Sequence, residues 1–427
     1  MRTTKYIIYS ALCALMALCS SCKVSPVEWV DFTDFSGLDE TKSFVPYGAG
    51  IDNEITPETL EACPTIDSED GDGDSRTTSI AGLTLIRKFF SFSNNKSVRS
   101  YCGTYWSTDI DGNPIKLSGR IILPAKGKVS RIMVVSHFTI GRNDEAPSLT
   151  LPLEAVFATK GMAVVVPDYL GYGLTPELIH PYLCKDITAR NVVDMYFAAL
   201  PFLRYIDCMP EHDDIVLLGY SQGGAANLCV QQLLVDEYPS TKINIALSGS
   251  GPYDIAKTYD IMVAKDRTTF PSAVPILIQG LNVGCKLNLD YALLFQKPLL
   301  DSYNKLLNTK EYTMGQINIF LNAKYISELM TPYGRDIKEP QTAILYQSMI
   351  DNSIIHTCYP KTRQYLYHSY DDDIVPFENS EEMQKHFEEI GFTDVTYNFG
   401  HYGGHNMGFL HFVNFAMEHL KEIGIVK

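Results

Sequence analysis

Residues 215–224 constrain the fold of this chain more than any other segment. The uniformly apolar run Ile-Val-Leu-Leu is typical of a buried strand, and Gly-x-Ser-x-Gly follows at once, before a helical pattern that begins near Ala225. So sharp a turn leaves no room for a Cβ two positions before or after the serine. We therefore predict a strand, tight turn and helix that expose Ser221, and we interpret Ser221 as a catalytic nucleophile.

Length and charge bound the remaining possibilities. The chain has 427 residues, of which 45% are hydrophobic. This suffices for a large core, either one domain with insertions or two domains. The formal net charge of −15 leaves no basic block to neutralise phosphates, so we predict no nucleic-acid partner.

The N-terminus is typical of an export signal. A positively charged start and an apolar run over residues 6–18 precede Leu-Cys-Ser-Ser-Cys, which ends at Cys22 and is similar to a bacterial lipobox. Cys19 stands where that pattern usually has an aliphatic residue. We predict a signal peptide over residues 1–21, lipidation of Cys22, and an exported bacterial lipoprotein in the periplasm or attached to the outer membrane. Ordinary cleavage to a secreted soluble protein is the alternative.

Residues 22–80 are rich in loops and acidic side chains, and we interpret them as an N-terminal tether. The Asp-x-Asp-x-Asp run at 70–74 is similar to a calcium loop, but Ala81 stands where the bidentate glutamate belongs, so a solvated linker is favoured. The cysteines lack close pairs, which argues against a disulfide framework while leaving one or two bridges open. No Cys-x-x-Cys or His-rich spacing indicates a metal site.

Alternating patterns predict an α/β fold with a mostly parallel twisted sheet, antiparallel leading strands and helices on both faces. A hairpin is expected over 101–107 and 114–124, with Asp-Gly-Asn at its turn. Further strands are expected at 132–136, 162–167, 215–218, 244–248, 364–367 and 395–399, and helices at 153–160, 186–206, 228–238 and 409–423.

Residues 255–340 interrupt this alternation with apolar, helix-like stretches. We interpret them as a helical cap or lid inserted into a core made of residues 81–254 and 341–427, and such a cap would give a substrate an apolar wall. The alternative is that these helices only extend the core.

A serine nucleophile needs a base, and the base needs an orienting carboxylate. Residues 371–373 are three aspartates after a late strand, where open α/β sheets place their sites. His401 and His405 lie in the Gly-rich loop before the last helix.

These motifs together resemble the α/β hydrolase superfamily, and within it the secreted lipases and esterases that carry a helical cap. Residues 368–376 are similar to the family pattern His-Gly-x-x-Asp-x-x-Val-Pro, with Ser369 in place of glycine, which implies Asp372 as the acid rather than Asp371 or Asp373. The resemblance also implies His405 as the base, with His401 as the alternative.

Acyl transfer requires donors aimed at the developing oxyanion. The backbone amide of Gln222 supplies one. The second is expected in the loop after the strand at 132–136, where the family usually has His-Gly and this chain has His137-Phe138, so we predict the amide of Thr139 or Phe138.

The function that this resemblance implies is hydrolysis of small-molecule or lipid carboxylic esters on a Ser-His-Asp triad, without a cofactor. Two alternatives are a prolyl-type serine peptidase, which uses the same fold and triad, and a binding protein on an inactive hydrolase scaffold. The sequence identifies no protein partner.

Overall fold

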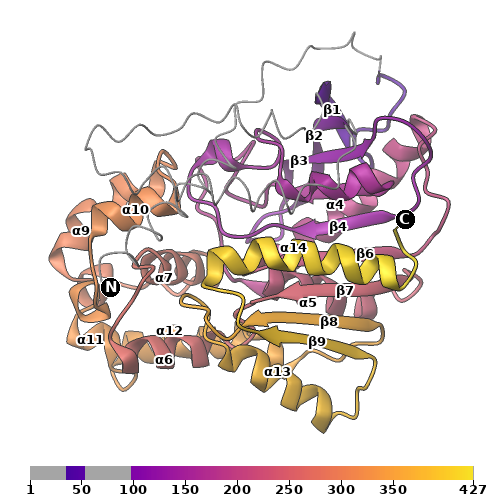
Figure 1. Cartoon of the computed structure of the whole chain (residues 1–427). Helices are drawn as coiled ribbons and strands as arrows, with labels where there is room; N and C mark the ends of the chain where they lie inside the picture. The colour runs from indigo at the N-terminus through magenta and orange to yellow at the C-terminus, as the bar shows by residue number, and fades with distance from the viewer. Residues whose placement is uncertain (1–34, 53–97, 427) are drawn as a thin grey trace, which may run out of the picture.

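The computed structural model describes residues 35–52 and 98–426. The predicted signal peptide, Cys22 and most of the predicted tether, with its acidic run, lie outside these residues. Figure 1 shows the chain coloured from its N-terminus to its C-terminus.

One sheet organises the molecule. Within the described residues nine strands pair in the order β1-β2-β3-β5-β4-β6-β7-β8-β9. Neighbours are antiparallel from β1 to β5 and parallel from β5 to β9, as the sequence predicted. The strands are β1 (Val45–Asp52), β2 (Val98–Thr108), β3 (Pro114–Pro124), β4 (Ile132–Ser136), β5 (Ala163–Pro167), β6 (Ile215–Tyr220), β7 (Ile243–Gly249), β8 (Arg363–Ser369) and β9 (Val395–Gly400).

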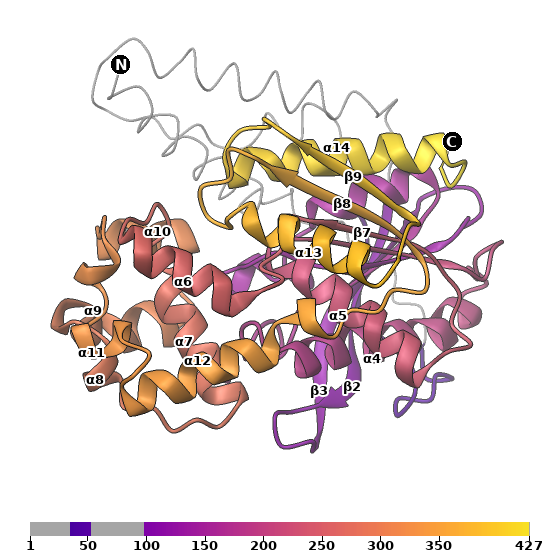
Figure 2. The same ribbon diagram turned by 90° about the horizontal axis from the view of Figure 1, so that it is seen from below.

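The central strands are apolar throughout because both faces of the sheet are covered. Leu217 of β6 packs in the cluster under α4 (Lys185–Tyr205), α5 (Gln222–Glu237) and α13 (Glu378–Glu389). Its neighbours Val216 and Leu218 pack in a second cluster under η2 (Leu153–Lys160) and α14 (His405–Glu422). Figure 2 shows α14 on one side of the sheet and α4 and α5 on the other.

A helical stretch lies beside the end of the sheet where β8 and β9 finish (Figure 1). It builds an apolar cluster of its own, which also takes in Tyr182 and Cys184 from the chain leading into α4. Its helices are α6 (Ile255–Lys265), α7 (Ala273–Gly284), α8 (Tyr291–Leu294), α9 (Lys297–Tyr303), η3 (Asn304–Asn308), α10 (Met314–Leu321), η4 (Ile326–Glu328), α11 (Pro332–Arg335) and α12 (Pro340–Asn352). The cluster includes Leu345 and Met349 of α12, so this helical stretch runs past residue 340, where the predicted cap ended. We call residues 255–352 the helical insertion.

Several elements differ from the predictions. Residues 153–160 form a 3-10 helix, and α14 begins at His405 rather than at 409. Strand β1 was not predicted; it is a short segment that contains proline and glycine and pairs with β2 at the edge of the sheet. Helix α13 was not predicted either, although Met383 and Phe387 stand at the i,i+4 spacing of a buried helix face.

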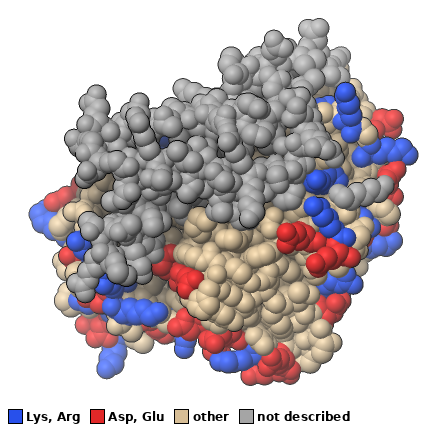
Figure 3. Space-filling model, viewed as in Figure 1, with Lys and Arg blue, Asp and Glu red and all other residues tan. Residues whose placement is uncertain are grey.

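On the face shown in Figure 3, Lys and Arg side chains are interspersed with Asp and Glu around an area without charged groups. The described part of this face therefore presents charges of both signs. In the part of the chain that the structure describes, no helix combines the length and the apolar character needed to cross a membrane.

Candidate active site

Ser221 sits on a strained turn between β6 and α5. Its backbone has φ 58° and ψ −125°. Residues other than glycine rarely adopt this conformation, and it often marks functional sites. A Cβ at Gly219 would lie 2.0 Å from the carbonyl oxygen of Gly223, and a Cβ at Gly223 would lie 1.9 Å from that of Ser136. The two glycines are therefore required by the close approach of the backbone.

A chain of hydrogen bonds runs from Ser221 through His405 to Asp372. His405 Nε2 lies 2.8 Å from Ser221 Oγ, and His405 Nδ1 lies 2.7 Å from Asp372 Oδ2. The other carboxylate oxygen of Asp372 accepts the amides of Ile374 at 3.0 Å and Val375 at 2.9 Å. The turns after β6 and β8 and the first residue of α14 thus bring Ser221, Asp372 and His405 together in the hydrogen-bonding geometry that a Ser-His-Asp triad requires.

The Asp372 carboxyl is fully buried. Burial alone would raise its pKa, but His405 and His368 outweigh that effect and hold the pKa well below the ordinary value of 3.8. His368 Nε2 lies 3.4 Å from Asp372 Oδ2, and its Nδ1 lies 2.7 Å from the hydroxyl of Ser380. The acid is therefore ionised and can stabilise a proton on the imidazole of His405.

The alternative residues lie elsewhere in the same loops. His401 Nδ1 is 2.9 Å from Asp371 Oδ1, and both side chains are largely exposed. Asp373 accepts the backbone amide of His405 at 3.0 Å, which fixes the start of α14. These three residues thus lie beside the hydrogen-bonded chain of Ser221, His405 and Asp372 and are not part of it.

Gln222 is the first residue of α5, where the partial positive charge of the helix N-terminus favours an anion. Its side-chain amide lies 2.7 Å from His180 Nε2, and His180 Nδ1 lies 2.8 Å from the carbonyl oxygen of Leu170. Burial lowers the pKa of His180 to about 3, so the ring is neutral and accepts the amide of Gln222 while donating to Leu170. This contact holds Gln222 in place.

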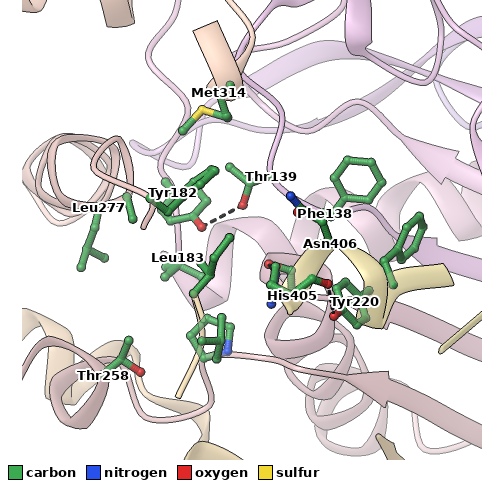
Figure 4. Close-up of a pocket in the computed structure, with 18 of the residues that line it drawn as sticks. Phe138, Thr139, Tyr182, Leu183, Tyr220, Thr258, Leu277, Met314, His405 and Asn406 are labelled. Atoms are coloured by element: carbon green, nitrogen blue, oxygen red, sulfur yellow. Dashed lines mark hydrogen bonds between the residues drawn. The ribbon is translucent and has the colours of Figure 1, made fainter. Parts of the chain in front are cut away.

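The loop after β4 carries the other two candidate oxyanion residues. Thr139 Oγ1 lies 2.8 Å from the hydroxyl of Tyr182, the dashed contact in Figure 4. The ring of Phe138, where the family pattern has glycine, packs edge-on against Phe409 with centroids 5.1 Å apart. The ring of His137 lies between this loop and the end of β5, with Nδ1 2.7 Å from the carbonyl oxygen of Phe138 and Nε2 3.3 Å from that of Asp168.

A pocket lies between the sheet core and the helical insertion (Figure 4), and Ser221 is one of the residues that line it. It encloses about 1160 Å³, including the open space at its mouth. Ser221 and His405 stand on its core side, and most of its wall is apolar. The apolar lining comes from Phe138, Tyr220, Ile374, Val375 and Phe409 of the core and from Ile255, Met262, Phe270, Ala273, Leu277 and Met314 of the insertion.

A model of the secretory lipase family matches residues 150–421, which include all three residues of the hydrogen-bonded chain. The protein belongs to the secretory lipase family. No sequence among curated proteins matches this chain significantly.

Solved structures share the fold of this secretory lipase family member at low identity. The rice cell wall degrading esterase LipA from Xanthomonas oryzae superposes with a TM-score of 0.65 at 22% identity, over 80% of this chain and 92% of LipA. A protein from Legionella pneumophila superposes with a TM-score of 0.73 at 19% identity, over 89% of this chain and 98% of that protein. Candida antarctica lipase A superposes with a TM-score of 0.54 at 16% identity, over 73% of this chain and 74% of the lipase. These findings confirm the predicted α/β hydrolase fold.

Sequence reasoning missed Lys310, which joins the helical insertion of this secretory lipase family member to its core. Its buried amine donates to the carbonyl oxygens of Gly171 and Leu178, the latter at 3.0 Å, and lies 4.2 Å from the centre of the Tyr172 ring. The backbone of Lys310 also accepts the amide of Asn143, beside the candidate oxyanion loop. No sequence signal marks a lysine that acquires its partners only by tertiary packing.

Proposed function

We propose that this protein hydrolyses carboxylic esters through an acyl-enzyme formed on Ser221. The observation that carries this proposal is the hydrogen-bonded chain from Ser221 through His405 to the ionised Asp372 at the base of an apolar pocket. Membership of the secretory lipase family supports the same chemistry.

The geometry suits general-base catalysis. His405 Nε2 would take the proton of Ser221 Oγ as that oxygen attacks the ester carbonyl, and Asp372 would hold the imidazole and stabilise its charge. The amide of Gln222 at the N-terminus of α5 would donate to the oxyanion, with the amide of Phe138 or Thr139 as the second donor. His405 would then protonate the leaving alcohol, and water would release the acyl group by the reverse steps.

The helical insertion would act as a cap that shapes the substrate. Its contribution to the pocket wall is apolar, with Met262, Phe270 and Leu277 facing the space above Ser221. Burial of apolar surface favours esters with hydrocarbon groups over small charged esters. We therefore infer an esterase or lipase that prefers apolar substrates.

Rates on a p-nitrophenyl ester series from acetate to palmitate, measured beside proline-containing chromogenic peptides, test this function. We expect ester turnover that rises with chain length from acetate and no peptide cleavage. Peptide cleavage without ester turnover would support a prolyl-type peptidase instead. Absence of both activities would support a binding protein.

We also propose that the protein is exported and anchored by lipid at Cys22. The support is the lipobox-like sequence together with the secretory lipase family. Replacing Cys22 with serine (Cys22→Ser) should move the protein from the membrane fraction to the soluble fraction. Unchanged membrane association would argue against lipidation at this residue.

A further inference from the structure

Two cysteines meet where the helical insertion contacts the core. Cys184 immediately precedes α4 of the core, and Cys285 immediately follows α7 of the insertion. Their Sγ atoms are 3.9 Å apart, although 101 positions separate them in the sequence. The pair therefore spans the junction between the two parts of the protein.

The backbones at this junction are in close contact. A Cβ added at Gly284 would lie 3.1 Å from Cys184 Cβ and 2.2 Å from Cys184 Sγ. Cys184 Sγ also lies 3.4 Å from the carbonyl oxygen of Gly280 in the last turns of α7. The sulfurs of a disulfide are about 2.05 Å apart, so the two Sγ atoms must approach each other by roughly 2 Å. Rotation of the cysteine side chains can bring about this approach because the backbones already lie close together.

The surroundings of the two thiols differ. Cys285 Sγ accepts a hydrogen bond from Asn352 Nδ2 at 3.2 Å, and Cys285 borders a surface cavity together with Lys185 and Asp351. The hydrogen bond from Cys184, with that from Asn352, lowers the pKa of Cys285 to about 7. The same hydrogen bond and burial raise the pKa of Cys184. Cys285 is thus the accessible nucleophile, and Cys184 is the buried thiol beside it.

We propose that Cys184 and Cys285 form a disulfide that fastens the helical insertion to the core. The thiolate of Cys285 attacks one sulfur of an oxidised thiol-disulfide exchange protein or of oxidised glutathione, forming a mixed disulfide and releasing one thiolate. Cys184 then loses its proton and attacks the sulfur of Cys285, which releases the second thiolate. The oxidant takes up two electrons, and the two cysteines lose two protons.

This bridge lies directly behind two walls of the pocket. Tyr182 and Leu183 line the pocket just before Cys184, and Leu277 lines it from α7, as Figure 4 shows. A covalent link between Cys184 and the end of α7 fixes the distance between these walls. Its effect on substrate turnover rests on the proposed ester hydrolysis, whereas formation of the bridge does not.

Peptide mapping of the full-length exported protein tests the bridge. Free thiols are alkylated with N-ethylmaleimide at lysis, and the unreduced protein is digested and analysed by mass spectrometry. We expect a peptide pair linked through Cys184 and Cys285, with Cys208 alkylated. Alkylation of both Cys184 and Cys285, persisting after incubation with oxidised glutathione, would overturn the proposal, as would a link from either to another cysteine.

Thermal unfolding provides a second readout. Dithiothreitol should lower the midpoint of the wild type and of the control Cys208→Ser by roughly 5 °C, because the bridge closes a long loop. It should leave the Cys184→Ser/Cys285→Ser double variant unchanged. Equal shifts in all three proteins would overturn the proposal.

Ester hydrolysis measured in parallel separates the two proposals. Active protein with both thiols free would overturn the bridge alone. Bridged protein without hydrolysis would overturn the proposed function alone.

Discussion

His405 Nε2 lies 2.8 Å from Ser221 Oγ, although 184 positions separate the two residues. The contact exists because the C-terminal end of β6 and the N-terminal end of α14 lie at the same edge of the sheet. Tyr220, next to Ser221, adds a second link by donating its hydroxyl hydrogen to the carbonyl oxygen of His405 at 2.6 Å. The position of the imidazole is thus fixed from its backbone as well as from Asp372.

Replacing the proposed base should abolish turnover. His405→Ala should lower kcat/KM on p-nitrophenyl butyrate by at least about 10³-fold, because Ser221 would lose its proton acceptor. The matched control is His401→Ala, which removes a largely exposed histidine of the same loop. Comparable losses in both variants would contradict the assignment of His405.

The three neighbouring aspartates should differ sharply. Asp372→Asn should lower kcat by about 10⁴-fold, because an amide in that position would favour the wrong tautomer of His405. Asp371→Asn should change kcat by less than about 3-fold, since the carboxylate of Asp371 pairs with the exposed His401 rather than with His405. Steady-state kinetics on the two purified variants check this, and a larger loss for Asp371→Asn would refute it.

Much of the fold was predictable because buried parallel strands are short apolar runs, and the turns that follow them carry the chemistry. Ser221 could be placed from the strand and helix around it. Choosing Asp372 among residues 371–373 required the family resemblance, because local pattern cannot tell which carboxylate turns inward. The packing of Phe138 against Phe409 could not be predicted either, since it depends on where α14 begins.

Contacts made only by tertiary packing explain what the sequence did not reveal. Lys310 and Gly171 lie in segments 139 positions apart, and His180 reaches Gln222 across 42 positions. Nothing in the pattern around either residue distinguishes it from a surface lysine or a loop histidine. The role of Lys310 depends on how the helical insertion meets the core, and the role of His180 depends on packing within the core.

Lys310 should position the insertion over the active site. Lys310→Met removes its hydrogen bonds to the carbonyl oxygens of Gly171 and Leu178, and we expect KM for p-nitrophenyl butyrate to rise about 5- to 10-fold. The unfolding midpoint should also fall. Lys305→Met, which changes an exposed lysine of the same insertion, is the control. An unaltered KM and unfolding midpoint for Lys310→Met would contradict this role.

Glu154 should make stability depend on pH. Burial raises the pKa of this carboxyl to about 7 from its ordinary 4.5. Between those values the unfolded chain binds fewer protons than the folded one, so the free energy of unfolding should fall as pH rises, by on the order of 3 kcal/mol in all.

Glu154→Gln removes this titration. The free energy of unfolding is measured by urea denaturation. The value for Glu154→Gln minus the value for the wild type should be larger at pH 8 than at pH 5. Glu311→Gln, at an exposed position, should follow the wild type at both pH values. If the free energies of unfolding of the wild type and of Glu154→Gln differ by the same amount at pH 5 and pH 8, Glu154 does not titrate in this range.

The proposed mechanism requires that Ser221 forms the acyl-enzyme. Intact-mass and peptide analysis after reaction with a fluorophosphonate probe identifies the residue that acts as the nucleophile. We predict one added phosphonyl group, located on Ser221, with loss of ester hydrolysis in proportion to labelling and no labelling of Ser221→Ala. Full ester hydrolysis by Ser221→Ala, or a probe attached to another residue with Ser221 unmodified, would show that Ser221 is not the nucleophile.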